Sequence, residues 1–420
     1  MAGPPAAGAE MMRFYSCQGI CLVPISPAAL PPGAQQVDAP FAPLALLLYD
    51  SSPGARGIWG VRSYAELYES PGIGLLCPPQ ASPADFDFPK TLQSILASNG
   101  AAAVNTAYAN WHAVLRRLTS PPAHPRITLI GLGDVGGALL MGLKLLGHEL
   151  AGIGIYDPNA SQCARYEMEL NQVLPYDGAP LPPVTIQNES TLFDCDAILF
   201  AASRGVPPLS HQGDVRMAQY AANRHMLEPY AKRARDARFT GLFAQISDPV
   251  DHLARAVFEM SNEGASDAFD FAGLLPEQVQ GYGLGVMRAR AAYYAQSEQV
   301  DFSQGRAYGP HGEGLVIANA PNAGYDAALS LRLTELAQTA NLRVRELGFK
   351  PYIAPGLSSA CVSVLRTLRG EWHDGAVPLG GAYFGCTSRF TQNGLEVKRE
   401  ALCPALRARI EAAHTMLKEF

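Results

Sequence analysis

The sequence predicts an α/β protein whose largest domain is a parallel sheet covered by helices. From Arg126 onward, apolar segments of strand length alternate with helical segments, which is the pattern of parallel strands joined by crossover helices. A glycine-rich turn follows the first of these strands and opens a helix. The 420 residues are 48% hydrophobic, which is enough for a large core and for two or three domains.

The first part of the chain differs in composition and is predicted to be an additional α+β region over residues 1–120. Its run "FAPLALLLYD" predicts a buried strand. Helices are predicted over "DFPKTLQSILASNG", with Gly100 as the C-cap, and over "NTAYANWHAVLRRL". The prolines of "TSPPAHP" then mark a boundary, because they cannot continue a helix. An accessory domain, an oligomerisation surface and a regulatory module all remain open as roles for this region.

The alternating pattern continues through the middle of the chain. Strands are expected at "RITLIGL", "LAGIGIYD", "AILFAAS" and "FTGLFAQIS", with helices through Leu146, through Val173 and around residues 215–235. Residues 125–270 are therefore predicted to form the sheet domain. Residues 271–420 are predicted to form an α+β catalytic domain.

The glycine-rich turn has the spacing G-x-G-x-x-G at Gly131, Gly133 and Gly136, between a strand and a helix. The first glycine permits a tight turn, the second lets a pyrophosphate approach the backbone, and the third lets the helix pack on the strand. The N–H groups at the start of the helix, where Asp134 and Val135 lie, suit phosphate oxygens. This context indicates a Rossmann-type dinucleotide-binding domain.

Asp157 ends the second strand, 26 residues after Gly131. A carboxylate near this spacing accepts hydrogen bonds from ribose hydroxyls and repels a 2′-phosphate, so NAD is the expected cofactor rather than NADP. The alternative is that Asp157 only caps the turn before Pro158.

Composition and motifs argue against several other classes of protein. The net charge is −6 and no basic stripe occurs, so no nucleic-acid partner is expected. No uncharged apolar run approaches the roughly 20 residues of a membrane span, and no signal peptide is visible, so a cytoplasmic protein is expected. The eight cysteines form no pair of CxxC motifs, so no metal site is predicted.

Four downstream motifs follow the sheet pattern in a fixed order. Gly213, Arg216 and Asn223 are spaced as in a mobile loop and its following helix; "ISDPVD" contains Asp248; "GVMRAR" contains Met287 and Arg290; and "GPHGEG" contains His311. In order and spacing, the chain from Arg126 to about Arg399 resembles the lactate/malate dehydrogenase family.

The resemblance implies an enzyme that interconverts a small 2-hydroxy acid and a 2-oxo acid, and a homo-oligomer, either a dimer or a tetramer. It implies that His311 transfers the proton, that Arg290 binds the substrate carboxylate and that Arg216 polarises the carbonyl. Asp248 would contact the substrate oxygen. The residue that sets specificity falls among Leu209, Ser210 and His211.

Two positions depart from the family pattern. Met287 stands where the family has the aspartate that orients the histidine, and Asp248 stands where it has an asparagine. We hypothesise that the carboxylate has moved from position 287 to position 248. The alternative is a non-catalytic NAD-binding protein derived from the family. An NAD-dependent glycosidase with a metal is less well supported, because no ligand cluster is visible.

Overall fold

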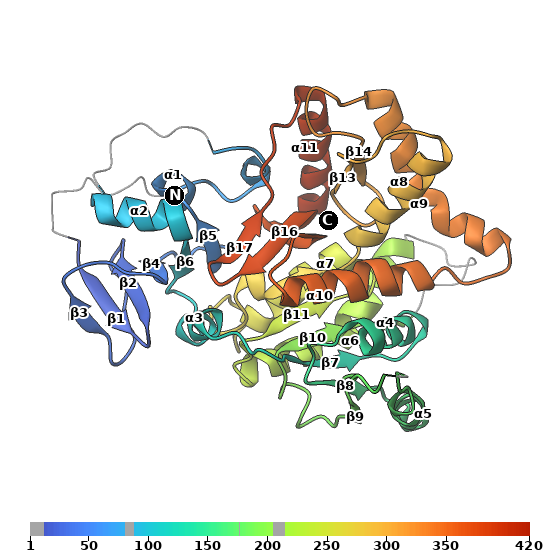
Figure 1. Cartoon of the computed structure of the whole chain (residues 1–420), viewed down its shortest axis with the longest axis horizontal. Helices are drawn as coiled ribbons and strands as arrows, with labels where there is room; N and C mark the ends of the chain where they lie inside the picture. Colours follow the sequence, from blue (N-terminus) through green and yellow to red (C-terminus); the bar gives the residue numbers. More distant parts are fainter. Residues whose placement is uncertain (1–11, 80–87, 176, 205–214) are drawn as a thin grey trace.

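The computed structural model describes residues 12–79, 88–175, 177–204 and 215–420, with the backbone alone described for 118–119 and 215–218. Within these ranges, one 15-stranded sheet runs through the molecule in the order β3-β1-β2-β4-β6-β5-β17-β16-β15-β12-β11-β10-β7-β8-β9. Figure 1 shows the N-terminal elements on the left, β7–β9 at the bottom and α8, α9 and α11 at the upper right. The α/β fold class is confirmed.

Six parallel strands form the dinucleotide-binding type of sheet. Their spatial order, β12-β11-β10-β7-β8-β9, is the order 3-2-1-4-5-6 of a doubly wound Rossmann domain read from its other edge. The strands are β7 (Arg126–Ile130), β8 (Gly152–Tyr156), β9 (Val184–Ile186), β10 (Ala197–Phe200), β11 (Leu242–Gln245) and β12 (Val279–Gly281). The sixth strand therefore comes from beyond residue 270.

Helices cover the sheet because its strands are apolar on both faces. Leu129 of β7 is fully buried and lies in one core with Leu139 and Leu143 of the first crossover helix. Ile130, on the opposite face, is 1% exposed and lies in another core with Leu227. The crossover helices are α4 (Asp134–Leu146), α5 (Ala160–Asn171), α6 (Val215–Asp236) and α7 (Val250–Asn262).

The last part of the chain adds antiparallel strands beside β12, through the pairing of Gly281 with Ala376. These strands are β15 (His373–Leu379), β16 (Ala382–Thr391) and β17 (Gly394–Val397), and a separate hairpin joins β13 (Arg306–Tyr308) to β14 (Val316–Ala318). The helices are α8 (Leu284–Ser297), α9 (Ala327–Glu346), a π-helical segment (Pro355–Val362), α10 (Ser363–Leu368) and α11 (Pro404–Glu419).

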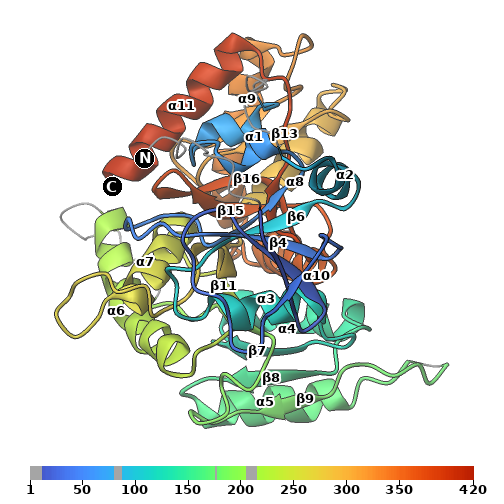
Figure 2. The ribbon, with the colours of Figure 1, turned by 90° about the vertical axis from the view of Figure 1, so that its left-hand side faces the viewer.

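The N-terminal region contains three parallel strands in the order β2-β4-β6, with β1, β3 and β5 at the margins. In Figure 2, β4 and β6 lie at a height between α11 above and β7 below. Helix α2 ends at Gly100, which has φ +70°, so the expected C-cap is present. The elements are β1 (Phe14–Cys17), β2 (Ile20–Pro24), β3 (Gln35–Val37), β4 (Leu44–Leu48), α1 (Tyr64–Leu67), β5 (Ile58–Val61), α2 (Lys90–Asn99), β6 (Ala101–Asn105) and α3 (Trp111–Thr119).

Two contacts fasten this region to the rest of the molecule. Strand β5 runs parallel to β17, with Trp59 aligned to Leu395, and so makes the sheet continuous. The carboxylate of Glu277, just before β12, accepts the backbone N–H groups of Gly57 and Ile58 at 2.9 to 3.1 Å. Burial raises the pKa of Glu277 to about 7, although these hydrogen bonds oppose the shift.

Neither a membrane-spanning helix nor a metal-binding cluster occurs among the residues that the structure describes. No helix there is long and apolar enough to cross a bilayer. No group of three or more His, Cys, Asp or Glu side chains there is placed to hold a metal ion.

Candidate active site

Three of the predicted site residues, together with Gly283, follow the ends of the parallel strands. Gly131 follows β7, Asp157 follows β8, Asp248 lies three residues after β11 and Gly283 lies two residues after β12. Strands β7 and β10 are neighbours, although the chain passes through β8 and β9 between them. Ligands of open α/β sheets bind at such a switch point, outside the carboxyl ends of the strands.

The glycine loop has the geometry that its spacing predicts. Gly131 has φ +95°, and a Cβ there would lie 2.4 Å from the backbone nitrogen of Ala202. A Cβ on Gly136 would lie 2.0 Å from the carbonyl oxygen of Gly131. A Cβ on Gly133, the N-cap of α4, would meet nothing within 4 Å. Gly131 and Gly136 therefore permit close packing, and Gly133 leaves open space in front of the helix N-terminus.

The two other residues predicted for cofactor contact lie in the first turn of α4. Asp134 forms an ion pair with Lys350 at 2.8 Å, and Val135 is partly buried against the core. The phosphate-binding capacity at this helix end therefore rests on backbone N–H groups rather than on these side chains.

Asp157 links the second strand to the glycine loop. Its Oδ2 accepts the N–H of Leu132 at 2.8 Å, and its Oδ1 accepts the N–H of Asn159 at 2.9 Å. The turn-capping role is therefore present. Each carboxylate oxygen retains acceptor capacity for a hydroxyl, so this role does not exclude contact with a ribose.

The structure brings together His311 and Asp248, the two residues that the relocated-carboxylate hypothesis pairs. Nδ1 of His311 lies 3.1 Å from Oδ1 of Asp248, and their side chains are 17% and 53% exposed. Burial lowers the pKa of His311, but the charge and hydrogen bond of Asp248, with a further contribution from Asp251, outweigh it and raise the pKa above 6.5.

Several backbone contacts hold the histidine loop. Asp251 on α7 is 5% exposed and accepts the backbone N–H of His311 at 3.0 Å. The N–H of Gly309 donates to the carbonyl of Gly385 on β16 at 2.9 Å. A Cβ on Gly283 would lie 2.8 Å from the Cβ of His311. Sequence reasoning assigned no role to Asp251 or Gly283. Asp251 belongs to the Asp-Pro-Val-Asp motif, but that motif does not indicate a contact with His311. Gly283 could have been considered, because it lies between an expected strand and helix.

The side chain of Asn223 holds the backbone of Asp248. This side chain is fully buried; its Nδ2 donates to the carbonyl of Asp248 at 2.7 Å, and its Oδ1 accepts the N–H of Arg204 at 3.0 Å. One side chain thus joins the chain segments that follow β10 and β11. The backbone around Asp248 is therefore fixed by a buried amide.

Comparison with solved structures identifies the fold. The chain superposes on a lactate dehydrogenase from a deep-sea metagenome library of the Medee basin, with a TM-score of 0.58 and 14% identity, over 71% of this chain and 98% of that one. It superposes equally well, at 0.58 and 18% identity, over 71% and 98%, on a minor L-lactate dehydrogenase from Enterococcus mundtii. A malate dehydrogenase from Archaeoglobus fulgidus in complex with NADH gives 0.57 and 16% identity over 70% and 97%.

The chain has the lactate/malate dehydrogenase fold. No model of a known protein family matches the sequence, and no curated protein does. The neighbours are covered almost completely while 71% of this chain is used. The chain therefore adds a substantial segment to the dehydrogenase fold, in agreement with the predicted N-terminal extension.

Within this dehydrogenase fold, Arg290 lies on α8 beside the position that holds Met287. Its Nη1 lies 3.5 Å from the sulfur of Met287 and 3.4 Å from the carbonyl oxygen of Ala337. In the part of the chain that the structure describes, no carboxylate lies within ion-pair distance of Arg290. Burial lowers the pKa of Arg290, and the charges of Tyr294 and Asp248 act in the opposite direction.

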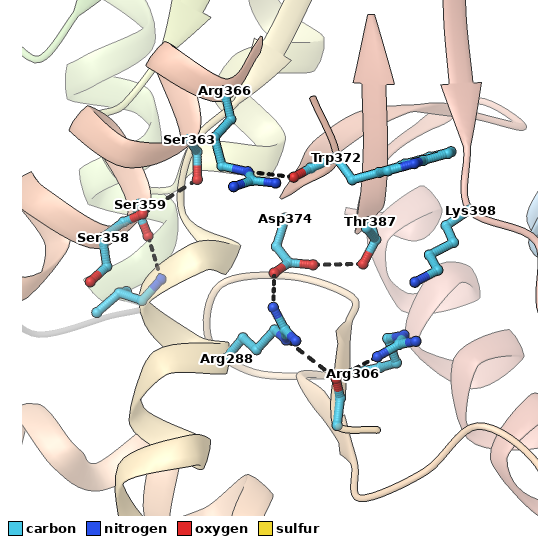
Figure 3. Close-up of polar contacts among 12 residues, drawn as sticks. Arg288, Arg306, Ser358, Ser359, Ser363, Arg366, Trp372, Asp374, Thr387 and Lys398 are labelled. Carbon is cyan, nitrogen blue, oxygen red and sulfur yellow. Dashed lines mark hydrogen bonds and ion pairs between the residues drawn. The ribbon is translucent and has the colours of Figure 1, made fainter. Parts of the chain in front are cut away.

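Arg288, two residues before Arg290, serves a different contact. Its Nη1 donates to Oδ2 of Asp374 at 3.4 Å and its Nε to the carbonyl of Gly305 at 3.2 Å, while Thr387 donates to Oδ1 of Asp374 at 2.6 Å. Figure 3 shows Arg288 directed at Asp374. Residues two apart on a helix face different sides, so Arg288 does not substitute for Arg290.

The mobile-loop residues of the dehydrogenase pattern were predicted from spacing. Gly213 and the three candidate specificity residues, Leu209, Ser210 and His211, lie outside the described residues. Arg216 lies in the first turn of α6, but its side chain is not among those described. The role assigned to Arg216 stays a prediction.

Proposed function

We propose that the protein is an NAD-dependent 2-hydroxyacid dehydrogenase that interconverts a small 2-hydroxy acid and its 2-oxo acid. The observation that carries this proposal is the contact between the imidazole of His311 and the carboxylate of Asp248, in a dehydrogenase fold that also has Arg290 on α8. A protein that only bound NAD would have no need for a partly buried histidine that lies 3.1 Å from a carboxylate and whose pKa is raised by it.

The glycine loop fits the cofactor. A pyrophosphate needs backbone N–H groups and open space, and Gly133 offers both at the N-terminus of α4. Asp157 stands at the carboxyl end of β8, where a carboxylate selects NAD over NADP. In its reduced form the bound cofactor would supply a hydride to the second carbon of the 2-oxo acid, and in its oxidised form it would accept the hydride from the 2-hydroxy acid.

The protein's own residues would bind the acid and move its proton. Arg290 would hold the substrate carboxylate through two parallel hydrogen bonds, for which its planar guanidinium is suited. Asp248 would accept from the Nδ1–H of His311 and orient the ring. The Nε2–H of the imidazolium would then donate its proton to the oxygen of the 2-oxo acid, leaving a neutral ring that still donates from Nδ1. Arg216 would polarise the carbonyl.

The decisive experiment is an NADH-oxidation screen over 2-oxo acids, including pyruvate, branched-chain and dicarboxylic members. Turnover is expected on at least one of them, and Arg290→Ala should abolish it while leaving NADH affinity unchanged. Tight NADH binding without turnover of any 2-oxo acid would reject the proposal and favour a non-catalytic NAD-binding protein.

A further inference from the structure

Helix α9 contacts two parts of the candidate site. The carbonyl oxygen of Ala337 lies 3.4 Å from Nη1 of Arg290. The next residue, Gln338, is partly buried, and its Nε2 donates a hydrogen bond to the carbonyl oxygen of Gly312 at 2.7 Å. One turn of α9 therefore contacts both the arginine proposed to bind the substrate carboxylate and the residue that follows His311.

The position of α9 relative to α8 is fixed by packing. Leu333 and Ala337 of α9 are fully buried and share one core with Met287 and Ala291 of α8. The two helices lie side by side in Figure 1. Because a close-packed core resists small displacements, a hydrogen bond from α9 to the histidine loop also fixes that loop relative to Arg290 on α8.

The bond from Gln338 holds the histidine loop from another element than the bonds described above. Asp251 accepts the backbone N–H of His311 from α7, and the N–H of Gly309 donates to β16. Gln338 holds the loop after the histidine, at Gly312. Loss of this bond would therefore let the segment after His311 shift while the segment before it stays attached.

The residue at position 287 explains why such a bond matters in this chain. In the dehydrogenase pattern an aspartate at this position orients the histidine directly from α8. Met287 offers only a weak acceptor, so α8 cannot orient the imidazole in that way. Asp248 contacts the ring from the segment after β11, which does not fix the ring relative to α8. Gln338 supplies a connection to α8 by way of α9.

We propose that Gln338 is a positioning residue that sets the distance between the imidazole of His311 and the guanidinium of Arg290. This inference rests on the function proposed above, in which Arg290 holds the acid and His311 gives it a proton. Reacting groups must lie about 3–3.5 Å apart, and a misplacement of about 1 Å can cost about a hundredfold in rate. Gln338 acts through the loop and contacts no reacting atom.

Gln338→Met tests the role, because it keeps the length of the side chain and removes the donor. For the best 2-oxo acid, kcat should fall about tenfold, which is less than the full effect of misplacement because Asp251 and Gly309 still hold the loop. KM should change by less than about twofold, since Arg290 is untouched. The carbonyl of Gly312 keeps the N–H of Leu315 at 3.1 Å, so the substitution leaves no unpaired carbonyl.

The matched control is Gln296→Met, which replaces an exposed glutamine of α8. This variant should keep the kcat and KM of the wild type. A loss of kcat in the control equal to that in Gln338→Met would overturn the proposal, because the effect would then not depend on the bond to Gly312.

Two charged variants separate position from charge. Gln338→Glu, when ionised, cannot donate but brings a negative charge toward His311, which raises the pKa of the ring. If Gln338 acts by position, kcat on the acid plateau of the pH profile should be as low as in Gln338→Met. Gln338→Lys returns a donor and brings a positive charge, so plateau kcat should recover while the profile shifts toward acid. Full plateau kcat in Gln338→Glu would overturn the proposal.

NMR titration of His311 gives a readout that needs no turnover. Burial lowers the pKa of this ring, the charge and hydrogen bond of Asp248 raise it, Asp251 also raises it, and Arg290 lowers it. If the loop shifts in Gln338→Met, the contact with Asp248 lengthens and the pKa of His311 should fall, whereas Gln296→Met should titrate like the wild type.

The outcomes distinguish this inference from the function on which it rests. A wild type that turns over no 2-oxo acid would reject the proposed function, and a titration shift confined to Gln338→Met would still support the positioning role. In an active enzyme, Gln338→Met with unchanged kcat and unchanged titration of His311 would overturn the role of Gln338. A rise in KM as large as the fall in kcat would also overturn it, because Arg290 would then have moved with the loop.

Discussion

Replacing Asp248 with Asn is the sharpest test of the candidate site. The substitution keeps the size and the hydrogen-bonding carbonyl of the side chain but removes the charge that faces Nδ1 of His311 at 3.1 Å. What then remains is burial and the charge of Arg290, which lower the pKa of His311, against the charge of Asp251, which raises it. The pKa of His311 should therefore fall.

The size of the effect follows from the contact. A hydrogen bond to a charged group contributes roughly 1.5–3 kcal/mol. Because the Asp248 side chain is 53% exposed, solvent screens the pair, and the lower end of that range applies. About 1.4 kcal/mol is tenfold in the equilibrium between imidazolium and imidazole. At a pH above the pKa of His311, kcat/KM for reduction of a 2-oxo acid should therefore fall about tenfold.

Two assays measure this change. The pH profile of kcat/KM with NADH and the best 2-oxo acid should shift toward acid, because reduction needs the protonated ring. Independently of any substrate, NMR titration of the imidazole signals should show His311 losing its proton at lower pH in Asp248→Asn than in the wild type. The control is the double variant that adds Met287→Asp, which returns a carboxylate to the position where the dehydrogenase pattern has it and should recover the profile.

An unchanged titration of His311 in Asp248→Asn would refute the pairing itself. A shifted titration with an unchanged rate profile would leave the pairing intact and refute the role of His311 as the proton donor.

Four other predictions concern cofactor choice, the proposed carboxylate-binding arginine, the packing of the histidine loop and a buried glutamate. NAD(H) should bind at least about tenfold more tightly than NADP(H), and Asp157→Asn should remove most of this difference in a fluorescence titration; equal affinities in the wild type would contradict the assignment of Asp157. Arg290→Lys should raise KM for the 2-oxo acid at least about tenfold in steady-state kinetics, because the bidentate fork is lost, and an unchanged KM would place the carboxylate elsewhere. Gly283→Ala, whose Cβ would lie 2.8 Å from that of His311, should lower kcat while NADH affinity stays constant; normal kcat would show that the loop adjusts freely. Burial raises the pKa of Glu277 from 4.5 to about 7, so the folded protein holds a proton that the unfolded chain releases in this range, and stability should fall by about 3 kcal/mol as pH rises from about 4.5 past 7. Urea denaturation of Glu277→Gln should lack this slope; the wild-type slope in the variant would show that another group carries it.

The sequence was sufficient for those elements whose signals are local. The glycine spacing, the apolar runs of β7, β8, β10 and β11, and the Gly100 cap each depend on a few adjacent residues. Strand β12 could be expected only from the resemblance to the dehydrogenases, because its three residues, Val-Gln-Gly, have no strand pattern of their own and pair with β11 through tertiary packing. The pairing of Trp59 with Leu395 joins residues that are far apart in the chain, and neither segment alone indicates the other.

In the candidate site too, local motifs could be found from the sequence, and contacts that depend on packing could not. Motif order was enough to nominate His311, Asp248 and Arg290. Met287, in place of the family's aspartate, led to the hypothesis of a relocated carboxylate, and Asp248 lies 3.1 Å from Nδ1 of His311 as that hypothesis requires. The support from Asp251 could not be predicted, because its carboxylate meets the backbone of His311 only once α7 and the histidine loop are packed together.

The residues at positions 248 and 287 also change the electrostatics of the candidate site. An aspartate three residues before Arg290 on α8 would lie on the same helix face and would neutralise part of its charge. Met287 offers a thioether, a weak acceptor, so the guanidinium keeps its full attraction for a substrate carboxylate. The cost is that Asp248 now brings a negative charge close to the arriving anion. That repulsion is cancelled when His311 is protonated, since Asp248 and the imidazolium then form a neutral pair.

Binding of a 2-oxo acid should therefore be coupled to proton uptake by His311, and calorimetry in buffers of different ionisation enthalpy should detect close to one proton taken up per acid bound above the pKa of the ring. Anion binding without proton uptake would show that Asp248 stays away from the substrate.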